Sequence, residues 1–107
     1  MRMGKAHDEP QERRLGAALP GVHMIAFGTP TAILLAGATV AVLLEDGRTV
    51  AGTVVIDEVD DPRVSIRPWG CAGLHELDLV DVAACAIVSA RFDVVQRIGI
   101  EQRREWR

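Results

Sequence analysis

One stretch of the chain decides the fold: Val40-Ala41-Val42-Leu43-Leu44-Glu45-Asp46-Gly47-Arg48-Thr49-Val50-Ala51-Gly52-Thr53-Val54. Apolar residues alternate on both sides of its acidic Gly turn, which is typical of a β-hairpin. A two-residue loop would put the two apolar sets on opposite faces of the hairpin. A three-residue loop, Glu45-Asp46-Gly47 with its glycine in the left-handed region, pairs Val42 with Val50 on one face. We therefore predict the longer loop, with Gly52 opposite Val40, where a missing side chain permits a sharp bend.

Short elements are predicted on both sides of this hairpin. Thr29-Pro30 predicts the start of a short helix ending before Gly37, because Pro fits the first helical position. A short strand or lid is predicted around Val22–Phe27. After the hairpin the pattern predicts an acidic turn, two strands, a 3-10 turn and an apolar closing strand, at Asp57–Pro62, Val64–Pro68, Leu74–Leu79, Val80–Val82 and Ala83–Ala90. The closing strand is apolar on both faces, so we expect it to be buried or paired with another chain.

The last part of the chain changes period. From Arg91 onward, side chains of one face recur every three or four residues, at Phe92, Val95, Ile98 (or Gly99), Gln102 and Trp106. This spacing predicts an amphipathic C-terminal helix with most of its arginines on the polar side. The helix could cover the open end of a barrel through Phe92, Val95 and Ile98, or it could dock on a partner or a polyanion.

The predicted fold is mostly β. We expect a small five-stranded barrel of the SH3/Sm type, with a short helix before the hairpin and an amphipathic helix at the C-terminus. A chain of 107 residues is long enough for one domain with a modest core. We divide it into a flexible polar arm (1–14), the barrel (15–90) and the C-terminal helix or tail (91–107).

The stretch Leu34–Val54 resembles the first motif of the Sm/LSm family: a short helix, a strand, an acidic Gly-Arg turn, and a strand that begins Gly-x-hydrophobic. Proteins of that family form five-stranded barrels, which assemble edge to edge into rings and bind single-stranded, often U-rich RNA. The resemblance implies a barrel, a homo-oligomer and an RNA ligand. Glu58 and Pro62 stand where the family places Asp and Asn.

Charge and cysteine usage narrow the class of protein. Between residues 15 and 90, nine acidic residues stand against three arginines, whereas both ends are weakly basic. An acidic body argues against binding to duplex DNA, since phosphates need Lys and Arg partners. Cys71 and Cys85 are too few for a disulfide framework, so we predict free thiols and a cytoplasmic protein.

One apolar stretch leaves a membrane segment open. Met24–Leu44 contains no charged residue and follows Arg13 and Arg14, as a membrane anchor would. Pro30 interrupts it, and its second half is better used as a strand that runs into the hairpin turn. A membrane-anchored small subunit is therefore the third alternative for the function.

The candidate binding residues lie around one loop and in the tail. Arg67, Trp69 and His75 flank the loop and Arg63 lies nearby, so an aromatic face between guanidinium groups could hold an unpaired base. Alternatively, Trp69 plugs one end of the barrel and the arginines pair with acids. With the tail included, the candidate set for a nucleic acid or another partner is Arg63, Arg67, Trp69, His75, Arg103 and Arg104.

Residue patterns for catalysis and metal binding are weak. Cys71, His75 and Cys85 could supply three zinc ligands, but no fourth ligand has the usual paired spacing. The acidic residues of Asp57–Pro62 lack the spacing of a calcium loop, and no Gly-x-Ser-x-Gly or phosphate-cradling loop exists. The sequence thus predicts no catalytic residues, no metal and no cofactor.

Two functions from different classes remain, beside the membrane subunit. The first is a non-catalytic β-barrel module that self-associates through edge strands, as a homo-oligomer or in a larger assembly. The second is a single-stranded nucleic-acid binding protein that uses Trp69, Arg67 and the basic tail.

Overall fold

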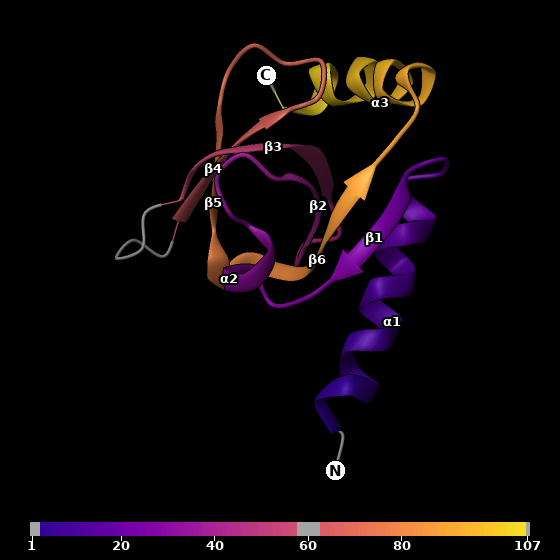
Figure 1. The fold of residues 1–107 in the computed structure, drawn as a ribbon, viewed down its shortest axis with the longest axis vertical. Helices are drawn as coiled ribbons and strands as arrows, with labels where there is room; N and C mark the ends of the chain where they lie inside the picture. Colours follow the sequence, from indigo (N-terminus) through magenta and orange to yellow (C-terminus); the bar gives the residue numbers. More distant parts are fainter. Residues whose placement is uncertain (1–2, 58–62, 107) are drawn as a thin grey trace.

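An antiparallel sheet of six strands forms the body of the protein (Figure 1). The computed structural model describes residues 3–57 and 63–106, and the side chains of residues 10–55 and 63–106. The strands are β1 (His23–Phe27), β2 (Thr39–Leu44), β3 (Thr49–Asp57), β4 (Arg63–Pro68), β5 (His75–Asp78) and β6 (Val82–Ser89). The helices are α1 (Met3–Ala18), α2 (Pro30–Ile33) and α3 (Phe92–Glu105), and a 3-10 turn, Leu79–Asp81, joins β5 to β6.

The central hairpin, β2 and β3, has the predicted register. Val42 pairs with Val50 and Val40 pairs with Gly52. The N–H of Leu44 donates to the carbonyl oxygen of Arg48 at 2.8 Å, which leaves three residues in the loop. Gly47 has a φ of 94°, in the left-handed region that glycine adopts without a steric penalty. The prediction of a three-residue loop with a left-handed glycine is therefore confirmed.

The strands lie in the order β1-β6-β2-β3-β4-β5, so the sheet is open. Among the described residues, β1 and β5 each pair on one side only and form its two edges. The mostly β architecture, the short helix before the hairpin and the C-terminal helix are confirmed. The closing strand β6 is not an edge, because it pairs with β2 on one side and with β1 on the other. The strand that we expected to be buried or paired with another chain thus pairs with β1 of the same chain.

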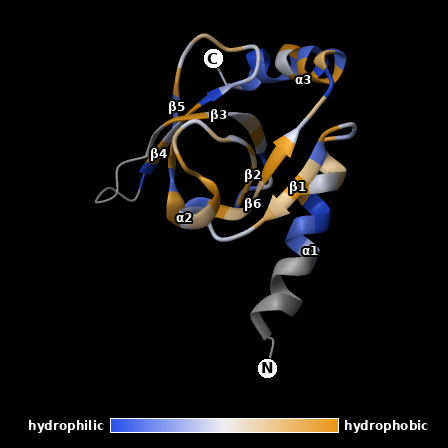
Figure 2. Ribbon diagram, viewed as in Figure 1, coloured by the Kyte–Doolittle hydropathy of each residue, from blue (hydrophilic) through white to orange (hydrophobic). Residues whose placement is uncertain are grey.

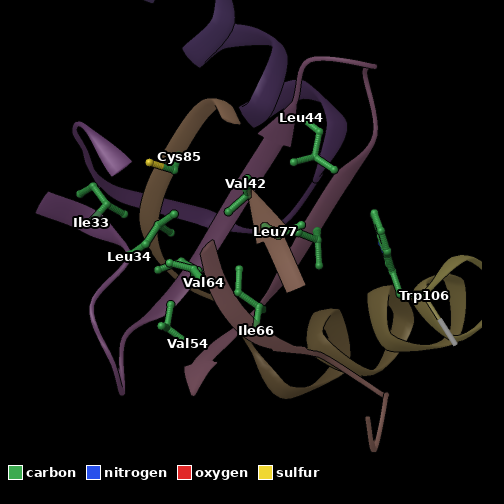
Figure 3. Close-up of a cluster of buried hydrophobic side chains, with 12 residues drawn as sticks. Ile33, Leu34, Val42, Leu44, Val54, Val64, Ile66, Leu77, Cys85 and Trp106 are labelled. Carbon is green, nitrogen blue, oxygen red and sulfur yellow. The ribbon is translucent and has the colours of Figure 1, made fainter. Parts of the chain in front are cut away.

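Two clusters of apolar side chains, one on each face of the sheet, make the core. Strand β2 belongs to both, since Val40, Val42 and Leu44 enter one cluster while Ala41 and Leu43 enter the other. The first cluster, which we call the inner cluster, is shown in Figure 3. Its further buried members are Ile33, Leu34, Val50, Val54, Val64, Ile66, Leu77, Cys85 and Trp106. The second cluster, which we call the outer cluster, lies under α1 and α3, and its further buried members are Leu15, Leu19, Ala51, Ala86, Val88 and Ile98. Figure 2 shows the hydrophobic residues gathered on the central strands.

Helix α1 occupies part of the region where we expected a flexible polar arm. Its C-terminal half carries Leu15, which is fully buried, and just beyond the helix Leu19 is 5% exposed. Because residues four apart lie on one face of a helix, this pair anchors α1 on the sheet, where the helix packs on β6 and β2. These two leucines therefore give α1 its buried contacts with the sheet, although the helix is rich in polar and charged residues.

The apolar stretch Met24–Leu44 is divided among β1, α2 and β2. No helix among the described residues is long and apolar enough to cross a membrane. Helix α2 begins with Thr29 at its N-cap and Pro30 in its first turn, as predicted. Most of the predicted acidic turn, residues 58–62, lies outside the described residues.

Helix α3 differs from its prediction at one end. Ile98 and Trp106 are buried as expected, and so are Gly99 and Gln102. Phe92, which would help to cover the barrel end in one of the two roles considered for this helix, is 74% exposed. Phe92 therefore does not take that role, whereas Val94 in the same turn packs against the outer cluster.

Candidate interaction site

The predicted binding residues lie in three separate places in the structure. Arg63, at the start of β4, lies 3.3 Å from the carboxylate of Glu76 on β5, and both side chains are more than half exposed. Arg67 is exposed on β4, opposite Thr53. The side chain of Trp69 is half-buried, and part of it packs against the outer cluster.

Helix α3 crosses the loop that follows Trp69. The loop and the helix come into close contact at Gly70 and Gly99, where a Cβ added to Gly70 would lie 2.5 Å from the carbonyl oxygen of Gly99. A hollow of about 310 Å³ opens beside this crossing and is lined in part by Gly70, Ile100 and Arg103. Of the tail arginines, Arg103 thus lies near the predicted loop. Arg104 is exposed and does not line this hollow.

Trp106 and His75 form an aromatic pair that the sequence did not predict. Their ring centroids lie 4.1 Å apart in an edge-to-face arrangement. The guanidinium group of Arg48, from the hairpin loop, lies 4.4 Å from the centroid of the indole. The indole is 4% exposed, and its N–H donates to the carbonyl oxygen of Thr49 at 3.2 Å. Trp106 therefore serves as a buried anchor, not as an exposed platform for a base.

Gln102 pairs with the backbone of β3 in the way that a strand would. Its Oε1 accepts the N–H of Ala51 at 2.7 Å, and its Nε2 donates to the carbonyl oxygen of Ala51 at 3.0 Å. The same Nε2 lies 3.2 Å from the carbonyl oxygen of Trp69. Strand β4 ends at Pro68, and beyond it the N–H of Trp69 donates to the carbonyl oxygen of Ala51 at 2.9 Å, so Gln102 supplies the partner for the N–H of Ala51. The sequence feature that could have indicated this contact is Gln102 itself, a polar residue on the apolar face of the helix.

The cysteines and His75 do not assemble into a metal site. Both thiols are free, as predicted; Cys71 is half-buried and Cys85 is buried. The Sγ of Cys85 donates to the carbonyl oxygen of Gly28 at 3.4 Å, in the inner cluster, whereas His75 packs on Trp106. Among the described residues, no group of three or more His, Cys, Asp and Glu side chains is placed to hold a metal ion.

The two thiols should differ sharply in reactivity. Burial raises the pKa of the Cys85 thiol to about 12, so almost no thiolate, the reactive form, exists there at neutral pH. We expect iodoacetamide to modify the native protein once, at Cys71, and the urea-unfolded protein twice. Mass spectrometry with peptide mapping checks this. Equal labelling of both cysteines in the native protein would contradict the placement of Cys85.

The strand edge at β1 is the most prominent unpartnered surface of the sheet. Ile25 is 57% exposed and Phe27 is 37% exposed, and the five residues of β1 include no acidic residue, Lys or Arg. Figure 2 shows most of this strand in the hydrophobic colour. The opposite edge, β5, is four residues long and carries Glu76 and Asp78, both exposed. Short, charged strands protect a sheet edge against pairing, whereas long apolar ones invite it.

Comparison with known proteins adds no family to this description. The chain matches no protein-family model, no curated protein and no solved structure. The function must therefore be argued from the exposed edge of β1 and from the contacts of α3.

Proposed function

We propose that this protein is a non-catalytic β-module of the SH3/Sm-like class, and that it self-associates by pairing β1 with β1 of a second copy. The observation that carries the proposal is the contrast between the two edges of the sheet. The β1 edge is uncharged and exposes Ile25 and Phe27, whereas the β5 edge carries two exposed acidic residues. Support for the class comes from the hairpin turn and from the short helix before it.

A second copy suits the β1 edge because an uncharged strand is complementary to itself in an antiparallel arrangement. A two-fold axis near Ile25, where β1 has a bulge between Met24 and Ala26, brings two uncharged strands together, and no like charges meet. Such a pairing is closed, so it yields a dimer with one continuous sheet. Pairing of β1 with β5 of the next copy would instead yield a ring or a filament, and it would place apolar side chains beside Glu76 and Asp78.

A lysine at the proposed axis tests the interface. In Ile25→Lys two ammonium groups would face each other across the axis, so we expect the dimer dissociation constant to rise about tenfold or more. Sedimentation velocity over a range of protein concentrations measures this change. Ile25 is more than half exposed, so the monomer should keep its fold, and circular dichroism verifies that.

Leu74→Lys is the matched control. Leu74 is 49% exposed and precedes the other edge strand, β5, so its replacement should leave the dissociation constant unchanged. A wild-type protein that stays monomeric at every concentration would refute the proposal. A dimer that Ile25→Lys leaves intact would refute the β1 interface, and sensitivity of both variants would favour the β1–β5 pairing.

Single-stranded nucleic-acid binding through Trp69 has less support. The indole packs against the outer cluster, Arg63 is paired with Glu76, and Arg97 of α3 donates to the carbonyl oxygen of Pro20. A base-stacking surface needs an open aromatic face beside unengaged cations. Trp69, Arg63 and Arg97 have contacts within the protein, whereas Arg67, Arg103 and Arg104 are exposed.

A further inference from the structure

Trp106 holds the C-terminal end of α3 against the sheet. Figure 3 shows this indole at one end of the inner cluster, with Ile33 and Cys85 at the other. The indole contacts two groups from different elements, Arg48 of the hairpin loop and His75 of β5. Its N–H bonds to Thr49, on the same edge of β3 that Gln102 covers at Ala51. The last turn of α3 is thus attached through a residue beside one fixed cation, Arg48, and one group that can change charge, His75.

His75 is the neighbour that can gain a proton in acid. Its ring is half-buried, and the paired residue across the ladder on β4 is Ile66, which is apolar. Arg48 is the charged group that acts on it, and Asp46 is bonded to that guanidinium at 2.9 Å. The other charged groups on the elements around it are exposed: Glu76 with Arg63, Arg67, Asp78, Glu45 of the hairpin loop, and Arg103, Arg104 and Glu105 of the last turn of α3. A proton on the imidazole therefore adds a second cation beside the same indole.

We propose that His75 and Arg48 form an acid-sensitive latch on Trp106. When His75 gains a proton, two cations flank one buried indole, and the last turn of α3 leaves the edge of β3. Release exposes the carbonyl oxygen of Thr49 and the end of the inner cluster. The latch lies at β3 and β5, so it is independent of the proposed pairing through β1.

The direction of the pH effect follows from the pKa of His75. Burial lowers this pKa below the ordinary imidazole value of 6.5, and the positive charge of Arg48 lowers it further. A released His75 titrates near the ordinary value, so acid protonates the released form first. The docked form therefore has its full stability above pH 6.5, and it loses stability as the pH falls from 6.5 toward the lowered pKa.

The indole N–H of Trp106 reports the state of the latch. The chain contains two tryptophans, so a proton–nitrogen NMR spectrum holds two indole signals, and loss of one in Trp69→Phe assigns them. As the pH falls from about 7.5 to about 5, we expect the Trp106 signal of the wild-type protein to shift and its protection from hydrogen exchange, relative to the intrinsic rate at each pH, to decrease, with a midpoint below that of a free imidazole.

Three variants complete the test. In His75→Gln the Trp106 signal should not depend on pH over this range. In Arg48→Gln the midpoint should move up toward 6.5, because one of the two causes of the lowered pKa is gone. His23→Gln removes an exposed imidazole on β1 and should leave the transition unchanged. A pH-independent signal in the wild type, or a transition that persists in His75→Gln, would overturn the proposal; an unmoved midpoint in Arg48→Gln would remove Arg48 from the latch.

Discussion

Replacing Gly52 with alanine should lower the free energy of unfolding by about 3 kcal/mol or more, a large part of the roughly 5–15 kcal/mol that a domain of this size has. A Cβ at this position would lie 2.1 Å from the carbonyl oxygen of Arg67 and 2.8 Å from the Cα of Pro68. Both atoms belong to the backbone of β4, so no side-chain rotation relieves the clash. Either β3 and β4 separate at this point, or the hairpin loses its register with Val40.

Gly73→Ala is the matched control for this variant. A Cβ at Gly73 meets nothing within 4 Å, and its backbone is outside the left-handed region. We expect its free energy of unfolding to stay within about 0.5 kcal/mol of the wild-type value. Urea unfolding followed by circular dichroism measures both variants. Similar stabilities for Gly52→Ala and Gly73→Ala would contradict the close contact between β3 and β4.

Replacing Gln102 with leucine should lower the free energy of unfolding by about 2–4 kcal/mol. The leucine side chain is similar in size but offers no polar atom, so the N–H of Ala51 and the carbonyl oxygen of Trp69 each lose their Gln102 partner. Unpaired buried groups of this kind cost about 1–3 kcal/mol each. Gln102 is 5% exposed, which leaves little room for water to replace the amide. The same variant should accelerate hydrogen exchange at the Ala51 amide.

Gln96→Leu is the control on the same helix. Gln96 is exposed, so the identical substitution should change the free energy of unfolding by no more than about 0.5 kcal/mol. If the two glutamine variants were equally stable, the bonds of Gln102 to β3 would contribute nothing measurable, and α3 would be held by its apolar contacts alone.

The parts of the fold that were predictable are those that local chemistry determines. The register of the hairpin follows from the parity of the apolar residues around Gly47, and α2 follows from Thr29-Pro30. Both depend on neighbours within a few residues. Strand β1 was expected as a strand or lid, but its pairing with β6 was not, because no local pattern says which distant strand it joins.

The candidate sites were harder to predict for the same reason. The sequence places Trp106 on the apolar face of the C-terminal helix and so predicts its burial, but it does not predict the contacts of Trp106 with Arg48 and His75. Arg48 was treated as part of a turn, although the turn places its guanidinium on an aromatic ring more than fifty residues away in the chain. These contacts join residues that are far apart in the chain, so the local sequence pattern could not predict them.

The pairing of the first strand with the last has a consequence during synthesis. As the chain leaves the ribosome, β2 and β3 can form their hairpin at once, whereas β1 must wait until β6 has been made. Throughout that interval Met24, Ile25 and Phe27 have no sheet to join, and a nascent segment of this kind is exposed to unwanted association. Translation rate and chaperone supply should therefore affect the yield of this protein more strongly than they affect a protein built from consecutive hairpins.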